Sequence, residues 1–130
     1  MNLFMYGVDK YKDENEVYGI IYSDYPDSLL NSDFKDELVD NYFNNAIACA
    51  VSNIKGNKVS EKKIAYHSYP GREIKISFSD GNAIMYMQMF LVKNRAYMLE
   101  VGCETKNDNN KDITNFFNSF SLLTDGEVKK

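Results

Sequence analysis

Residues 69–101 read YPGREIKISFSDGNAIMYMQMFLVKNRAYMLEV, and this stretch decides the fold of the chain. Polar and apolar side chains alternate over residues 73–78, as in a strand with one buried face. Residues 83–92 are apolar on both faces, so this strand should lie in the middle of a sheet with a layer on each side. In the next segment, residues 96–103, the larger apolar side chains share one face: Tyr97, Leu99, Val101 and Cys103. Together the three segments predict an antiparallel meander.

Sharp turns are expected before and between these segments. Pro70 and Gly71 suit a type II turn, because Pro fixes a negative φ and Gly tolerates the positive φ that this turn requires. We therefore expect Gly71 to have a positive φ. Hairpin turns are expected at Asp80-Gly81 and at Lys93-Asn94.

Further strands are expected nearer the N-terminus. Residues 3–8 and 17–23 are rich in β-forming residues, so they predict a strand pair joined by a densely charged loop at 9–15. Residues 58–67 carry apolar side chains among lysines, which is typical of a strand at a sheet edge. The sheet should therefore contain five or six strands.

A long helix is expected at residues 33–54. Asp33 can cap its N-terminus, and Asp36 and Glu37 would then favour the positive end of the helix dipole. Gly56 can end the helix. The main apolar stripe has the spacing of a face that packs on a sheet, and consists of Val39, Phe43, Ile47, Ala50, Val51 and Ile54. A second apolar set forms either an internal contact or an exposed patch: Phe34, Leu38 and Tyr42.

A short helix is expected near the C-terminus, at residues 112–120, with three rings directed inward: Phe116, Phe117 and Phe120. Residues 1–124 should form a single domain, and residues 125–130 a loose tail.

Three short motifs support a resemblance to a known family. They are P-G-R-E at residues 70–73, N-R-x-Y-x-L at 94–99 and F-x-x-S-F at 116–120. In this order they resemble the signature of a bacterial family of uncharacterised proteins, which is similar in fold to the PsbP superfamily. The resemblance implies an α+β fold, an α/β/α sandwich with a central antiparallel sheet, and no catalytic residues. The motif positions singled out as structural are Pro70, Gly71, Arg72, Glu73, Arg95, Tyr97, Phe117, Ser119 and Phe120.

Composition limits the classes of partner. The chain has 130 residues, of which 44% are hydrophobic and 26% charged, as expected for one globular domain. A net charge of -4 argues against nucleic-acid binding, which requires clustered Lys and Arg. No apolar run approaches the ~20 residues of a membrane helix. We therefore expect a soluble chain. The resemblance implies a bacterial protein of the cytoplasm or cell envelope, the compartment being left open, and leaves room for a leader or a further domain.

No motif in the sequence predicts catalysis, a cofactor or a metal site. His67 is the only histidine, and Cys49 and Cys103 lack C-x-x-C spacing. The two thiols should not be bonded to each other, because the helix phase points Cys49 away from the sheet that carries Cys103. Alternate methionines could bind Cu(I), but core filling is the simpler role of Met85, Met87 and Met89.

Two arginines lie at turns of the meander. Arg72 and Arg95 could hold an anionic ligand, but an ion pair with Glu73 or Glu100 is the simpler expectation.

The aromatic surplus points to binding rather than turnover. Tyrosine is enriched in recognition surfaces because its ring is apolar and its tip polar. The candidate surface comprises Tyr18, Tyr22, Tyr25, Tyr66 and Tyr69. The leading hypothesis is a non-enzymatic binding or accessory module that recognises a protein or peptide. The alternative is a small acidic chaperone or adaptor that dimerises through its long helix.

Overall fold

The computed structural model describes residues 2–7 and 15–121, and the side chains of residues 17–121. Most of the expected charged loop at 9–15 and the tail at 125–130 lie outside this part of the chain. In chain order the elements are β1 (Asn2–Gly7), β2 (Asn15–Asp24), α1 (Asp36–Asn53), β3 (Asn57–Tyr66), β4 (Tyr69–Phe78), β5 (Ala83–Val92), β6 (Arg95–Glu104), a 3-10 turn at Thr105–Asn107, and α2 (Lys111–Asn118).

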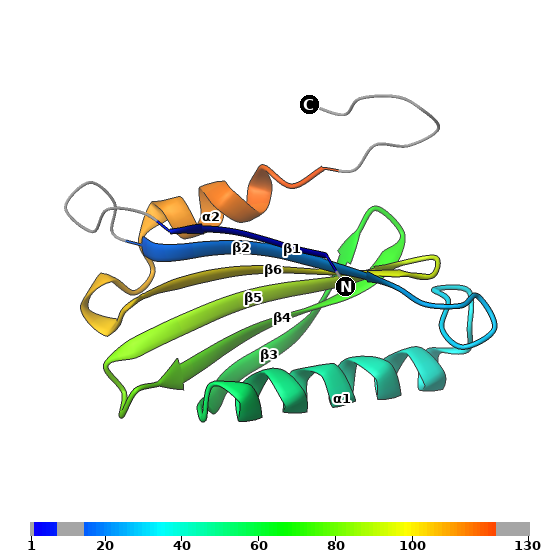
Figure 1. Ribbon diagram of the computed structural model, residues 1–130, viewed down its shortest axis with the longest axis horizontal. Coiled ribbons are helices and arrows are strands. Elements are labelled where there is room, and N and C mark those ends of the chain that lie inside the picture. The colour runs from blue at the N-terminus through cyan, green and yellow to red at the C-terminus, as the bar shows by residue number, and fades with distance from the viewer. Residues whose placement is uncertain (1, 8–14, 122–130) are drawn as a thin grey trace.

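The six strands form one antiparallel sheet in the order β1-β2-β6-β5-β4-β3. Strands β3 to β6 follow one another as the expected meander, and β2 returns to pair with β6, far away in the sequence. In Figure 1 the sheet lies between α1 on one side and α2 on the other. The predicted α/β/α sandwich is therefore confirmed, with β3 at a sheet edge as expected.

Strand β5 separates two cores, one on each face of the sheet. The core beneath α1 is aliphatic and rich in methionine, and its buried members include Val39, Phe43, Ile47, Ala50, Ile74, Ile76, Met87, Met89 and Leu91. The core beneath α2 includes Ile84, Phe90, Leu99, Val101, Cys103, Ile113 and Phe117. Odd-numbered residues of β5 face α1 and even-numbered residues face α2, as the doubly apolar pattern predicted.

The predicted turn at Pro70 and Gly71 is wrong. Both residues lie inside β4, and the chain reverses earlier, at His67, whose φ is 55°. Gly71 has no positive φ; its lack of a side chain serves close packing instead. A Cβ at this position would lie 2.5 Å from the Met89 carbonyl oxygen and 2.7 Å from the Phe90 ring. The glycine therefore allows β4 to pass close to β5.

The other two expected turns are confirmed. Residues 79–81 all have a positive φ, and so does Lys93 at the second turn. Left-handed backbone of this kind is typical of tight hairpin connections.

The start of α1 differs from its prediction. The helix begins at Asp36, and Lys35 occupies the N-cap position without a side-chain cap, so Asp33 is not the cap. The reason is a preceding turn: the Asn31 side chain accepts a hydrogen bond from the Asp33 amide at 3.0 Å, and Phe34 N–H donates to the Asn31 carbonyl. This turn keeps Asp33 outside the helix.

The end of α1 also differs in detail. The left-handed residue after the helix is Lys55, at a φ of 52°, and the Gly56 amide donates to the Val51 carbonyl at 3.0 Å. Gly56 is required for space, because a Cβ there would lie 2.5 Å from a methyl group of Ile76. The expected apolar stripe faces the sheet as predicted.

Candidate functional site

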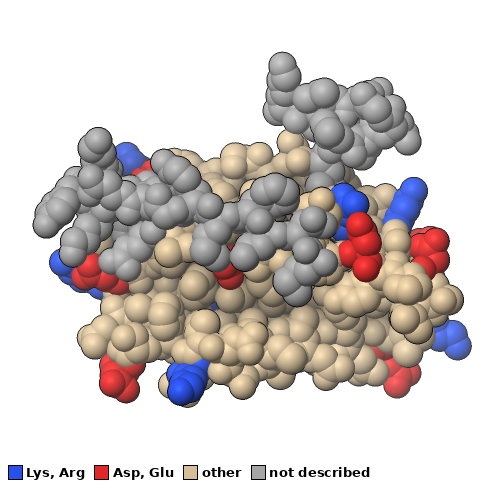
Figure 2. All heavy atoms as spheres, viewed as in Figure 1, with Lys and Arg blue, Asp and Glu red and all other residues tan. Residues whose placement is uncertain are grey.

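A groove lies beside α1 on the inner face of the sheet. The helix packs over β4, and the groove opens between the flank of the helix and the neighbouring strands β2 and β6. Its volume is about 600 Å³, which lies within the usual range of ligand pockets. We call it the α1 groove; its lining includes Ile21, Ser23, Tyr25, Tyr42, Asn45, Ala46, Cys49, Asn53, Met87, Met89, Ala96, Met98 and Glu100. Figure 2 shows a broad band of uncharged residues across the lower middle of this view.

The floor of the α1 groove is made by alternate residues of three strands. Met87 and Met89 from β5 are each only 3% exposed, and Met98 of β6 packs beside them. Ile21 of β2 lies opposite Met98 in the strand register. Unbranched methionine side chains adapt their shape to a neighbour, so this floor can adjust to an apolar ligand.

Glu100 is the single charged residue among the described residues of the lining. It lies in β6 between Leu99 and Val101, and it is only 9% exposed. Within residues 17–121 no side chain forms a hydrogen bond or ion pair with its carboxylate, and its oxygens are not among fully buried atoms that lack a partner. Burial raises the pKa of the Glu100 carboxyl, because removal from water disfavours the charged form.

Gly19 makes room for this carboxylate. It lies opposite Glu100 in the pairing of β2 with β6, and a Cβ on Gly19 would come within 2.9 Å of the Glu100 side chain. The glutamate side chain therefore lies across the glycine at the floor of the groove.

The wall of the groove is the flank of α1. Asn45, Cys49 and Asn53 are four residues apart and lie on one side of the helix, so two amides flank one exposed thiol. At one end the rings of Tyr25 and Tyr42 meet edge to face, with centroids 5.9 Å apart. Burial raises the pKa of the Tyr42 hydroxyl, so this group stays neutral.

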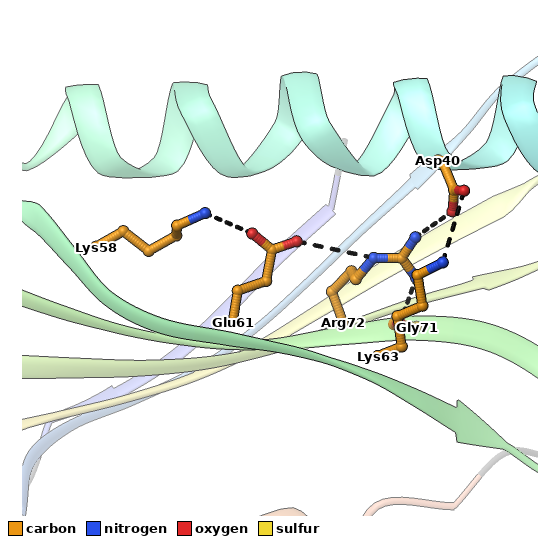
Figure 3. A network of polar contacts seen from close by, with 6 residues as sticks. All are labelled: Asp40, Lys58, Glu61, Lys63, Gly71 and Arg72. Atoms are coloured by element: carbon orange, nitrogen blue, oxygen red, sulfur yellow. Dashed lines mark hydrogen bonds and ion pairs between the residues drawn. The ribbon is translucent and has the colours of Figure 1, made fainter.

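A buried arginine fixes the wall to the sheet. Arg72 of β4 is 4% exposed, and its guanidinium donates to Asp40 of α1 and, at 2.8 Å, to the Gly71 carbonyl. Its Nε lies 3.9 Å from a Glu61 oxygen, and its charge lies 4.8 Å from the centre of the Phe43 ring. Figure 3 shows this network between the helix and the strands beneath it. It holds α1 at one position across the sheet and so sets the width of the groove.

Both arginines form ion pairs, but the predicted partners, Glu73 and Glu100, are wrong. Arg72 pairs with Asp40 and Glu61 rather than with Glu73, because alternation directs it to the α1 face. Arg95 forms two hydrogen bonds with Asp24, at 2.6 and 2.9 Å, since β2 and β6 are paired there. Glu73 instead pairs with Lys62 at 3.1 Å.

The structure divides the five candidate tyrosines between the two faces. Tyr25 alone lines the α1 groove, in contact with Tyr42. Tyr18 contacts Phe116 of α2, and Tyr66 contacts Phe90 and Phe120. Tyr22 and Tyr69 also lie on the α2 side. In the strand register Tyr22 is opposite Tyr97, and Tyr69 is opposite Tyr66.

Other sequence candidates take structural positions. His67 lies in the β3–β4 turn with its ring 4.4 Å from that of Tyr66. No disulfide joins the exposed Cys49 to the buried Cys103, as predicted. Among the residues that the structure describes, no three His, Cys, Asp or Glu side chains converge as a metal site, and no helix there is long and apolar enough to span a membrane.

Sequence reasoning did not identify Glu100 as a site residue. The signal was present, because a glutamate stands between Leu99 and Val101 on the alternate face of a buried strand. Its position beside a groove depends on where α1 crosses the sheet, which no local pattern specifies.

Comparison with protein-family models finds no match, and comparison with curated proteins finds none at the significance threshold. Two solved structures share the fold. A protein of unknown function from Pseudomonas aeruginosa, PA94, described as a putative regulator, aligns over 95% of this chain and 83% of its own with a TM-score of 0.61 and 8% identity. Cyanobacterial PsbP (CyanoP) from Synechocystis sp. PCC 6803 aligns over 90% of this chain and 77% of its own, with a TM-score of 0.50 and 8% identity. The chain therefore has a PsbP-like fold, as the motifs implied.

Proposed function

We propose that this chain is a non-enzymatic binding module that receives an extended, largely apolar segment of a protein or peptide in the α1 groove. The observation that carries the proposal is the groove itself: an apolar floor beside a fixed helix, left open within the described part of a well-packed domain. A concave, largely apolar site with a few polar groups is the usual form of a ligand pocket.

The dimensions of the wall suit a short extended peptide. Asn45 and Asn53 are eight residues apart on α1, which places them about 12 Å apart along the helix axis. An extended chain rises about 3.3 Å per residue, so about four residues span that distance. The two amides can then bond to peptide backbone groups while the ligand's side chains contact the methionines of the floor.

The five-tyrosine surface is a second, separate proposal. Four of its members lie on the α2 side, whereas Tyr25 lies in the α1 groove, so single variants distinguish the two sites. Tyr25→Ser should weaken peptide binding at the α1 groove, and Tyr69→Ser should leave it unchanged.

Dimerisation through α1 is the alternative function. It rests on Leu38, which is 53% exposed, because Phe34 and Tyr42 already pack against the chain's own core. Light scattering would detect a stable dimer, and Leu38→Asp should convert that dimer to a monomer.

A displayed library of random heptapeptides, selected on the whole chain, tests the groove proposal. Ala46→Trp fills the groove, and Ala48→Trp on the opposite flank of α1 is its matched control. We expect enriched peptides to bind the native chain and the control but not Ala46→Trp, and to slow alkylation of Cys49. Failure to enrich any peptide, or equal binding to both tryptophan variants, would overturn the proposal.

A further inference from the structure

The two buried charges of the described chain differ in their surroundings. Arg72 is surrounded by two carboxylates, a carbonyl and a ring face, so its charge is compensated within the protein. Glu100 is nearly as buried, and no described side chain bonds to it. The charged form of a carboxylate in so poorly solvated a position is disfavoured, so a positive group supplied from outside would be bound favourably.

The α1 groove gives such a group a path to Glu100. The carboxylate is part of the lining, and among the described residues of that lining no Lys or Arg competes for it. Because Gly19 has no side chain, the Glu100 side chain lies over it and stays within the floor of the groove. Among the described residues, the one charge that a ligand entering between α1 and β6 meets is therefore Glu100.

The surrounding residues suit a long aliphatic stem. Met87 and Met98 lie on the same face as Glu100, and Met87 is its direct neighbour across β5 and β6. The side chains of lysine and arginine carry three or four methylene groups that pack well on apolar surfaces while the charged end reaches a partner. The net charge of -4 also favours the approach of a cationic ligand.

We propose that the segment bound in the α1 groove carries a lysine or arginine whose charged end pairs with the Glu100 carboxylate. This inference rests on the proposed function and adds the ligand's chemistry to it: an apolar peptide with one basic side chain. Aliphatic neighbours of that residue contact the methionine floor, and the basic residue fixes the register of the peptide along the groove. Specificity then comes from a single charge-assisted contact in an otherwise apolar site.

The test compares heptapeptide selections on the native chain and on Glu100→Gln, which keeps the shape of the side chain and removes its charge. We expect peptides selected on the native chain to share a basic residue at one position, and those selected on Glu100→Gln to lack this preference. For one selected peptide, replacing the basic residue by norleucine should weaken binding to the native chain about 30-fold. The same replacement should change binding to Glu100→Gln by less than about threefold.

Controls separate failure of this inference from failure of the proposed function. Glu37→Gln, on the exposed first turn of α1, should bind the selected peptide like the native chain. Groove-bound peptides without a basic preference, or an equal norleucine effect on both proteins, would overturn the Glu100 inference alone. If no peptide is enriched, or if Ala46→Trp binds as well as the native chain, both proposals are wrong. Circular dichroism of every variant confirms that it is folded.

Discussion

The two faces of the sheet close in different ways. On the α2 side, a helix of eight residues and the rings that follow it cover the sheet: Phe120 stacks on Phe90 with centroids 5.7 Å apart and meets the rings of Tyr66 and Tyr97. On the α1 side, a helix of 18 residues covers the sheet only in part and leaves a groove along its flank. The longer helix therefore leaves part of its face of the sheet open, among the residues described.

Charged groups follow the same division. On the α2 side Lys75 lies 2.6 Å from Asp108, and this hydrogen bond raises the pKa of the Lys75 ammonium. Tyr86 donates to Asp108 as well. On the α1 side Arg72 is compensated but Glu100 is not, among the residues described. The α2 side is thus closed by stacked rings and an ion pair, whereas the α1 side keeps a groove with a carboxylate in its lining.

The largest expected effect concerns the ring beneath the α1 wall. Phe43 is 0% exposed and lies below Arg72, so Phe43→Ala should lower the free energy of unfolding by about 4 kcal/mol through the lost burial and the cavity left behind. Urea denaturation measures this change. Leu38→Ala, on the same helix at an exposed position, should change it by less than about 0.5 kcal/mol. Equal losses would mean that α1 does not pack as described.

The second prediction concerns close packing between β4 and β5. Gly71→Ala should destabilise the fold by about 3 kcal/mol, because the added methyl group meets backbone and ring atoms that cannot move apart without disturbing the strand pair. Gly81→Ala is the comparison: its methyl group meets open space, and only its φ of 85° opposes it, at a cost of about 1 kcal/mol. A larger loss for Gly81→Ala would indicate that backbone conformation, rather than close packing, sets the cost of replacing these glycines.

The third prediction separates the buried arginine from the exposed one. Arg72→Met should lower the free energy of unfolding by about 2 kcal/mol, less than for a fully buried pair because Asp40 and Glu61 still reach water. Arg95→Met should cost at most about 0.5 kcal/mol, since Arg95 and Asp24 are both well exposed. Thermal denaturation of the two variants provides the measurement. An Arg72→Met protein as stable as the native chain would show that the network does not anchor α1.

The smallest expected effect is a gain in stability. Glu100 has a folded-state pKa above its ordinary value of 4.5, so the folded protein holds this proton more tightly than the unfolded chain does. Its stabilising contribution is complete below about pH 4.5 and is lost as the pH rises through the folded-state pKa. Glu100→Gln should therefore be more stable than the native chain by about 1 kcal/mol at pH 8, and this difference should shrink toward pH 4.5.

Denaturation at a series of pH values tests this expectation. Glu37→Gln, at an exposed position, should show no comparable change of difference with pH. A Glu100→Gln variant that is less stable than the native chain at pH 8 would indicate that the carboxylate has a compensating partner in the folded protein.

Much of the fold follows from local patterns in the sequence. The bounds of β5 and its two apolar faces follow from ten consecutive residues, and the turns at Asp80-Gly81 and Lys93-Asn94 from pairs of residues. The stripe on α1 and the lysine-rich edge strand follow from periodicity and charge. Each of these features depends on side chains that are neighbours along the chain, so the sequence displays them directly.

Tertiary structure decided the roles of single residues that meet distant parts of the chain. Gly71 is explained by the approach of β5, and Asp33 is excluded from α1 by a turn that begins at Asn31. Glu100 becomes a candidate binding residue only because β2 places Gly19 beside it and Arg72 holds α1 to one side. The sequence determined that a two-layered sheet core would form, since burial follows local alternation. Where the helix lies across that sheet, and hence where the groove opens, depends on contacts between residues far apart in the chain, which only the folded structure brings together.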